Sequence, residues 1–340
     1  MTDPESSQSP PKVPDNVPRL RWWMALNYLN LDAPLVAVAW LALFAACRDV
    51  FVPLEAYYVL GIAVWCVYTI DHLADTRRAA SIEALTPRHR FHRMARLPMT
   101  GLLAVGMLLG GYITVHHLPS QLVLAGVLLA GLIVLYLIHA RAISETNSMR
   151  MPKELMCGLI FAIGTSLPAL VYGGSLNRLH MNHLLAPIVG MTEIVTSPDV
   201  LFFGLLCSLN CVAIAVWEWQ PGRVNDAAAI TRFIPSIREH FTKLVLILLG
   251  GALAFPLTIN LIRVLNLGSP GFPPYFTVFF SCIAGSTGLI GIIHWQRKRF
   301  KPDVLRVLAD VALLTPLAAI PFIPQSVWSL LKIAFGIGWE

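Results

Sequence analysis

The stretch that decides the fold reads Tyr68-Thr69-Ile70-Asp71-His72-Leu73-Ala74-Asp75-Thr76-Arg77-Arg78, and it ends an apolar run that begins at Leu54. An apolar run that ends in charge is typical of a helix that crosses a membrane and meets the lipid headgroups. On a helix, Asp71 and Asp75 share one face with Tyr68. Their like charges repel, unless a divalent cation lies between them. The stretch predicts either a cation site or a solvated helix end with Asp75 paired to Arg78.

The composition predicts an all-α integral membrane protein. Of the 340 residues, 56% are hydrophobic and only 13% are charged, with a mean hydropathy of +0.67. Soluble domains carry roughly 25% charged residues. The formal net charge of +6 is also compatible with nucleic-acid binding, but the distribution of the basic residues favours a membrane topology and no nucleic-acid partner.

Apolar runs long enough to cross a hydrocarbon layer of about 30 Å recur along the whole chain. They predict a bundle of about nine transmembrane helices, with eight or ten as the range. The last run contains Pro316, Pro321 and Pro324, so we expect it to be kinked or broken. The predicted spans are 26–47, 54–76, 97–116, 119–141, 154–172, 200–219, 241–265, 275–295 and 304–335.

The basic residues assign a side to each connection. If the amino terminus is cytoplasmic, 21 of the 25 Lys and Arg residues fall in cytoplasmic segments, and only Arg48, Arg178, Arg263 and Lys332 do not. This is the bias of the positive-inside rule. We therefore expect a multi-pass membrane protein with a cytoplasmic amino terminus, a carboxyl terminus on the opposite side, and its chemistry on the cytoplasmic face.

The rest of the chain organisation follows from composition. Residues 1–20 are rich in Pro, Ser and Asp and are predicted to form a disordered cytoplasmic tail, with 21–340 as one transmembrane domain. The outer loop 173–199 suggests no mechanism. The cysteines lie in or beside apolar runs without metal-binding spacing, which favours neither a disulfide framework nor a zinc site. They are Cys47, Cys66, Cys157, Cys207, Cys211 and Cys282.

A basic loop follows the Asp71 stretch. Arg88, Arg90 and Arg93 alternate with histidines in it. Arginine binds phosphate oxygens through two parallel hydrogen bonds. Carboxylates, a divalent ion and arginines at one place would bind a diphosphate and neutralise its developing charge as a leaving group. The alternative is that these arginines only follow the positive-inside rule and contact anionic lipid heads.

A second acidic helix end is predicted after the sixth span. Asn210 and Glu218 are eight residues apart and lie on nearly one helix face, and Pro221-Gly222 ends the helix before Asp226. The topology places Glu218 on the same side as Asp71. The alternative is an interfacial belt in which Trp217 and Trp219 flank an incidental acid.

A third candidate element ends the fourth span. Tyr136 is followed by His139 and Arg141, and Lys153-Glu154 begins the next span. A phenol and a cation at one membrane level are able to contact a phosphate. An aromatic belt residue with flanking anchors explains the same pattern equally well.

Together these elements resemble the UbiA-type membrane prenyltransferases, over residues 20–335. That family has nine transmembrane helices and two aspartate-rich motifs at the cytoplasmic ends of its second and sixth helices. Asp71 and Asp75 resemble the last two acids of the first motif, and Glu218 resembles the first acid of the second. Arg88, Arg90 and Arg93 resemble the basic segment, and Tyr136 resembles the tyrosine of a Tyr-x-x-x-Lys element.

The sequence departs from that pattern at several positions. Val67 and Tyr68 stand where the family has Asn-Asp, and Gly222 stands where the second motif has its next acid. The family lysine falls on Ala140, one residue before Arg141.

The resemblance implies a Mg²⁺-dependent enzyme that transfers an isoprenoid from a prenyl diphosphate to an aromatic or lipid acceptor within the bilayer. Asp71 and Asp75 would hold one ion. Glu218, with Asn210 or Asp226, would hold the other. The diphosphate would contact Arg88, Arg90, Arg93 and Tyr136, with Tyr68 and Arg141 as further substrate-binding candidates.

Two other functions are compatible with the sequence. The missing acids favour a lipid- or quinone-binding protein of the same fold without metal catalysis. A transporter that uses Asp71 and Asp75 as a proton relay is less favoured, because these acids lie at helix ends and transport sites usually lie near the bilayer midplane.

Overall fold

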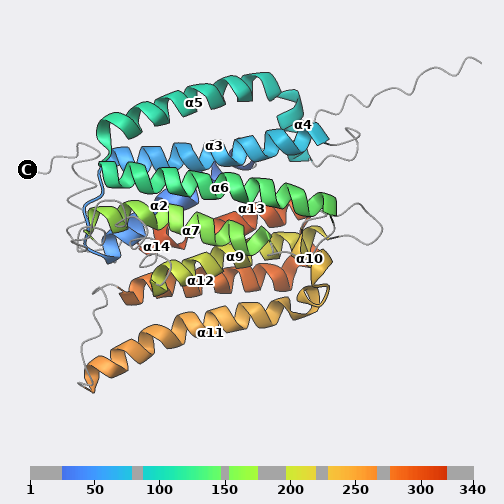
Figure 1. Ribbon diagram of the computed structural model, residues 1–340. Helices are drawn as coiled ribbons and strands as arrows, with labels where there is room; N and C mark the ends of the chain where they lie inside the picture. Colours follow the sequence, from blue (N-terminus) through green and yellow to red (C-terminus); the bar gives the residue numbers. More distant parts are fainter. Residues whose placement is uncertain are drawn as a thin grey trace, which may run out of the picture.

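The computed structural model describes residues 25–78, 87–146, 153–174, 197–219, 229–265 and 276–319, and all elements in these ranges are helical. The predicted tail 1–20, most of the outer loop and the end of the last run fall outside them. Figure 1 shows the arrangement. The helices are α1 (Ala25–Tyr28), α2 (Asp32–Cys47), α3 (Leu54–Arg78), α4 (Pro87–Met94), α5 (Arg96–His117), α6 (Ser120–Thr146), α7 (Lys153–Tyr172), α9 (Pro198–Glu218), α10 (Ile230–Phe233), α11 (Ile237–Val264), α12 (Phe276–Gln296), η2 (Arg297–Arg299), α13 (Pro302–Ala312) and α14 (Thr315–Ala319).

Within the described part, seven helices are long and apolar enough to cross a membrane: α3, α5, α6, α7, α9, α11 and α12, the last continued by η2. Their bounds agree closely with seven of the predicted runs. An all-α membrane protein is therefore the architecture that composition and structure support together. Helix α2 is apolar but has only 16 residues.

The first predicted span is interrupted, which the sequence pattern did not indicate. Asn30 adopts a left-handed backbone with φ of 57°, and α2 begins only at Asp32. The Asn27 side chain donates a hydrogen bond of 2.6 Å to Asp32. Asn tolerates the left-handed region better than most residues. The span predicted as 26–47 is thus a four-residue helix, a turn and a shorter apolar helix.

The last predicted span is also broken, as its prolines indicated. Helix α13 ends at Ala312, and α14 begins at Thr315 with Pro316 in its first turn, where the missing N–H of proline costs no helical hydrogen bond. The indole N–H of Trp40 donates a 2.7 Å hydrogen bond to the carbonyl of Leu313. The break therefore leaves a carbonyl that a side chain from α2 satisfies.

The basic segment after α3 is partly helical, where a loop was expected. Residues 87–94 form α4, which packs against α3 and α1. The rings of His72 and His92 stack with centroids 5.2 Å apart, and Phe91 lies against Tyr28 at 5.7 Å. Helix α4 thereby covers the end of α3 that carries the aspartates.

The bundle has central helices and outer helices. In their most apolar windows, 61% of the residues of α9 and 56% of those of α7 are buried, against 11% for α5 and 17% for α6. Outer helices expose large apolar side chains such as Leu97, Leu108 and Ile247. A soluble protein rarely exposes so much apolar surface, whereas lipid tails would cover it.

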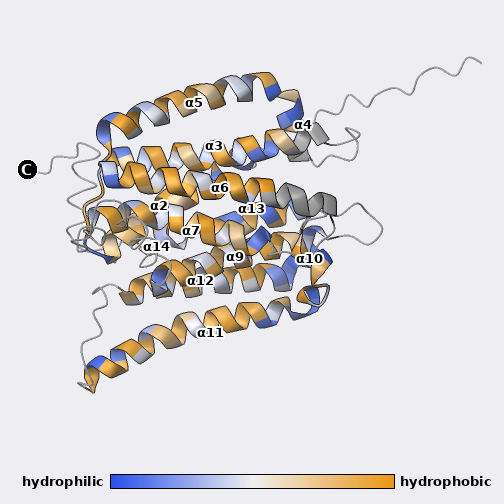
Figure 2. Ribbon diagram, viewed as in Figure 1, coloured by the Kyte–Doolittle hydropathy of each residue, from blue (hydrophilic) through white to orange (hydrophobic). Residues whose placement is uncertain are grey.

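The core of the bundle is aromatic around α9. Trp40 stacks on Phe203 with centroids 4.3 Å apart, and Phe44 and Phe279 complete the cluster. Helices α4 and α10 lie at the same end of the bundle, and Figure 2 shows hydrophilic residues concentrated there. We name this the α4 end.

Candidate functional site

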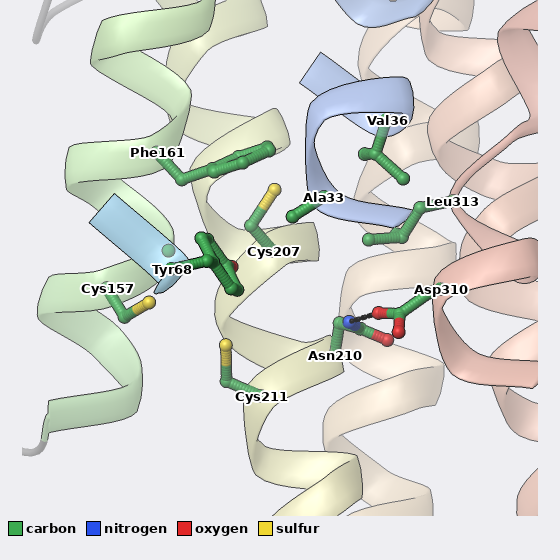
Figure 3. A pocket seen from close by; sticks show the side chains of 11 residues that line it. Ala33, Val36, Tyr68, Cys157, Phe161, Cys207, Asn210, Cys211, Asp310 and Leu313 are labelled. Atoms are coloured by element: carbon green, nitrogen blue, oxygen red, sulfur yellow. Dashed lines mark hydrogen bonds between the residues drawn. The ribbon is translucent and has the colours of Figure 1, made fainter. Parts of the chain in front are cut away.

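A cavity lies inside the bundle between α2, α3, α7, α9 and α13 (Figure 3). Along α9 it is about two turns from the helix end, and along α7 about one turn from the helix start, both at the α4 end. The space open to the centre of a water molecule is about 30 Å³, within a hollow of about 340 Å³ that includes its mouth. It is lined by Ala33, Val36, Tyr68, Cys157, Gly158, Phe161, Cys207, Asn210, Cys211, Asp310 and Leu313.

The lining combines apolar side chains and three thiols with the polar side chains of Tyr68, Asn210 and Asp310. Asn210 is 6% exposed, and its amide nitrogen donates to the Asp310 carboxylate at 3.4 Å. That bond uses the amide nitrogen and leaves the Asn210 Oδ1 atom as an acceptor. Oδ1 is buried and has no hydrogen-bond partner among the described residues. A buried acceptor left in this state costs roughly 1–3 kcal/mol.

Tyr68 is the aromatic member of the cavity. Its ring lies among the side chains of Cys157, Cys207 and Cys211 (Figure 3), and Asp310 and Asp32 are close enough to act on its hydroxyl electrostatically. The described lining contains one carboxylate and no lysine or arginine. The electrostatics therefore favour a neutral polar ligand over an anion in this cavity.

Two of the sequence-predicted substrate-binding residues, Tyr68 and Asn210, thus meet at one cavity although they lie on different helices. Tyr136 is half-buried beside it and contacts Cys157, and Asp71 lies within electrostatic range of both. These residues of the first and second acidic stretches lie together because α3, α6, α7 and α9 are neighbours with their ends at the same level.

The acid expected to anchor the second metal ion has a different partner. The Glu218 carboxylate is 2.5 Å from the Arg306 guanidinium of α13. Next to it, the Arg238 guanidinium lies over the Trp219 ring at 3.6 Å. Arg306 neutralises the charge of Glu218, so in this arrangement the ion pair joins α9 to α13.

The expected Mg²⁺ would require acidic donor groups that lie close together. In the ranges that the structure describes, no three His, Cys, Asp or Glu side chains lie close enough together to hold a metal ion. The backbone of Asp75 is helical, but its side chain falls outside the description, and Asp226 lies wholly outside it. The described residues therefore hold no preformed group of three such ligands, and Mg²⁺ binding stays a prediction from the resemblance.

Among the arginines predicted to bind substrate, the structure describes the side chains of two and not of the other two. Arg90 is half-buried and Arg93 is exposed, both on α4 over the end of α3. Arg88 and Arg141 lie in α4 and α6, but their side chains fall outside the description. Neither Arg90 nor Arg93 lines the cavity.

Several residues of the site were not singled out from the sequence. Asp310 is a lone acid inside an apolar run, a pattern that usually marks function within a membrane and would have identified it. Cys157 and Cys211 carry no such signal, because a thiol in an apolar run is usually a packing residue. Arg306 lies among the basic residues that follow α12, where the sequence indicates only a cytoplasmic connection.

No family model, no curated protein and no solved structure matches this chain. We therefore infer function from the geometry of the site.

Proposed function

We propose that this membrane protein binds the polar head of a lipophilic molecule of the quinone or phenol type in the Tyr68–Asn210 cavity. The observation that carries the proposal is the Asn210 Oδ1 atom, a buried acceptor in a cavity of the bundle with no partner in the described structure. Polar groups inside a membrane protein are costly and usually serve a function. A ligand hydroxyl, or water in the empty state, would satisfy this acceptor.

The head group is inferred from the donors and acceptors of the lining. The Tyr68 hydroxyl donates to a carbonyl oxygen, and Asn210 Oδ1 accepts from a hydroxyl. Phe161 and Tyr68 supply aromatic faces on which a flat ring can pack. The absence of arginine and lysine from the described lining disfavours a diphosphate in the same space.

The lipophilic tail is inferred from the surroundings. Apolar helices enclose the cavity, and the outer faces of α5, α6 and α11 expose apolar side chains suited to lipid. The space open to the centre of a water molecule is only about 30 Å³, well below the 300–1,000 Å³ typical of small-molecule sites, so a bound ring requires the lining helices to move apart. A tail extending between helices into the bilayer needs no further enclosed volume.

The test is equilibrium binding of decylubiquinone to the full chain in lipid nanodiscs, followed by quenching of tryptophan fluorescence. We expect saturable binding that Asn210→Leu weakens at least tenfold, about 1.4 kcal/mol or more. The matched control is Asn260→Leu, because Asn260 lies on α11 outside the cavity. Equal, non-saturable partition into nanodiscs with wild type and Asn210→Leu would refute the proposal.

A second candidate function is prenyl transfer from a prenyl diphosphate to an acceptor held in the cavity. It is supported by Asp71, which lies within electrostatic range of Tyr136, and by the basic helix α4 that covers the same end of α3. In this arrangement the α4 arginines would bind the diphosphate outside the cavity. Full retention of transfer in membranes carrying Asp71→Ala would exclude this candidate. Mg²⁺-dependent binding of a prenyl diphosphate analogue would favour it over quinone binding alone.

The orientation in the membrane is proposed from the charge bias alone. The α4 end carries the basic segments that the positive-inside rule places in the cytoplasm. The amino terminus would then be cytoplasmic. Labelling of single cysteines introduced at positions 80 and 270 with a membrane-impermeant maleimide tests this, in intact cells and in inverted vesicles. Labelling of position 80 from outside intact cells would reverse the assignment.

A further inference from the structure

Two thiols from different helices face the proposed quinone cavity. Cys157 of α7 and Cys211 of α9 both line it (Figure 3), and their thiols are close enough to act on each other electrostatically. Cys157 also interacts with the Tyr136 hydroxyl. Both cysteines are half-buried, and all six cysteines are free thiols. The pair is therefore placed where a bound head group would meet both sulfur atoms.

The two helices approach unusually closely at this level, because Gly158 follows Cys157. A β-carbon on Gly158 would collide with the side chain and the backbone of Ser208, one turn before Cys211. The Ser208 hydroxyl also donates to the carbonyl of Leu155 at 3.3 Å. A disulfide requires Cα atoms about 4.4–6.8 Å apart, which only such close backbone packing allows between two helices.

We propose that Cys157 and Cys211 are a redox-active dithiol that reduces a quinone bound in the cavity. Both S–H bonds break and one S–S bond forms between the two helices. The two electrons and the two protons pass to the quinone, whose two carbonyl oxygens become the hydroxyls of a hydroquinone. The inference depends on the proposed quinone binding, and the quinone is the only oxidant that the step requires.

The acceptor on Asn210 gives the reaction a direction. A quinone carbonyl cannot donate to Oδ1, so this buried atom stays unsatisfied, or keeps a water, while the quinone is bound. A hydroquinone hydroxyl can donate to it. The site therefore binds the reduced product with one hydrogen bond more than the oxidised substrate, and this difference favours electron transfer from the thiols to the ring.

The test is a single-turnover reaction of the full chain in nanodiscs under anaerobic conditions. The protein is reduced with a small thiol, freed of it, and mixed with decylubiquinone. We expect loss of the quinone absorbance, loss of two thiols per quinone consumed, and a Cys157–Cys211 disulfide in peptide mass spectra. Cys157→Ser and Cys211→Ser should each abolish quinone consumption. Cys282→Ser is the matched control and should react like wild type, because Cys282 lies outside the cavity.

Separate outcomes distinguish this inference from the proposed function. If decylubiquinone binds saturably to wild type and to both serine variants, but no disulfide forms, the dithiol role is wrong and quinone binding stands. If it binds saturably to none of them, both proposals fail. A disulfide that forms with the thiol oxidant diamide but not with quinone also overturns the electron transfer, because it shows that the sulfur atoms can meet without passing electrons to the ring.

Discussion

The polar side chains at the two ends of α9 have charged partners, whereas a polar side chain in its middle has an acceptor without one among the described residues. Near its start, Asp199 accepts hydrogen bonds from Arg48 at 2.6 and 3.1 Å, and at its end Glu218 pairs with Arg306. Between them, Asn210 keeps a buried acceptor open. Paired charges join α9 to its neighbours, whereas a buried acceptor without a partner costs stability in the empty state. Substitutions at the ends should therefore change stability, and substitutions in the middle should change binding.

The largest effect is expected from Arg48→Met. The Asp199 side chain is only 7% exposed, and without Arg48 it would be a buried carboxylate that has lost its guanidinium partner. Such a loss costs about 3 kcal/mol. Unfolding in mixed micelles of increasing dodecyl sulfate fraction measures this change. Lys243→Met is the control, because Lys243 is exposed; equal stability of the two variants would contradict the pairing, and quinone binding should be unchanged in both.

Gly158→Ala should affect both properties. The added methyl group meets the Ser208 backbone and forces α7 away from α9, at a cost of about 2 kcal/mol. The cavity between these helices changes shape, so quinone binding should fall together with stability. Gly131→Ala on α6 provides the control, since a β-carbon there meets nothing within 4 Å. Wild-type stability and binding in Gly158→Ala would show that the close approach is not required.

Tyr68→Phe should weaken binding without affecting the fold. It removes one hydroxyl and keeps the ring, so the expected loss is about 1 kcal/mol, or roughly fivefold in Kd. Tyr112→Phe on α5 is the control, because Tyr112 is 60% exposed on an outer helix. Decylubiquinone titration measures both variants. An unchanged Kd for Tyr68→Phe would show that this hydroxyl does not contact the ligand.

The smallest effect is expected from Arg306→Met. The Glu218 side chain is 35% exposed, so water stabilises its charge when the arginine is removed, and the expected loss is about 0.5 kcal/mol. The same micelle titration measures it. A loss as large as that of Arg48→Met would mean that the two ends of α9 are equally buried in the membrane protein.

Most helices of this protein could be predicted from apolar runs alone, because length and composition determine which segments cross a membrane. The break at Asn30 could not, since it depends on a left-handed backbone and on the Asn27–Asp32 hydrogen bond. The helix at 87–94 was also missed, because its helical form is supported by packing of Phe91 and His92 against other helices.

The candidate site was only partly predictable, for a related reason. Tyr68 shares a helix face with Asp71, and Asn210 shares one with Glu218, so their spacing from these acids identified both as candidates. The pairing of Glu218 with Arg306 and the proximity of Cys157 to Cys211 depend on how distant helices pack. Prenyl transfer and magnesium binding remain predictions from resemblance, and the described side chains support a neutral ligand in the cavity better than an anionic one.

The break between α13 and α14 has a mechanical consequence for α13. Helix α13 is a rod of 11 residues, and its far end lies at a turn where Trp40 holds the carbonyl of Leu313. A continuous span would have to bend to move its middle, whereas this rod can tilt about the turn with few helical hydrogen bonds disturbed. Asp310 and Leu313 lie at that pivot and in the cavity wall, so a small tilt of α13 would leave them nearly in place and would instead move Arg306, about two turns away, relative to Glu218 of α9.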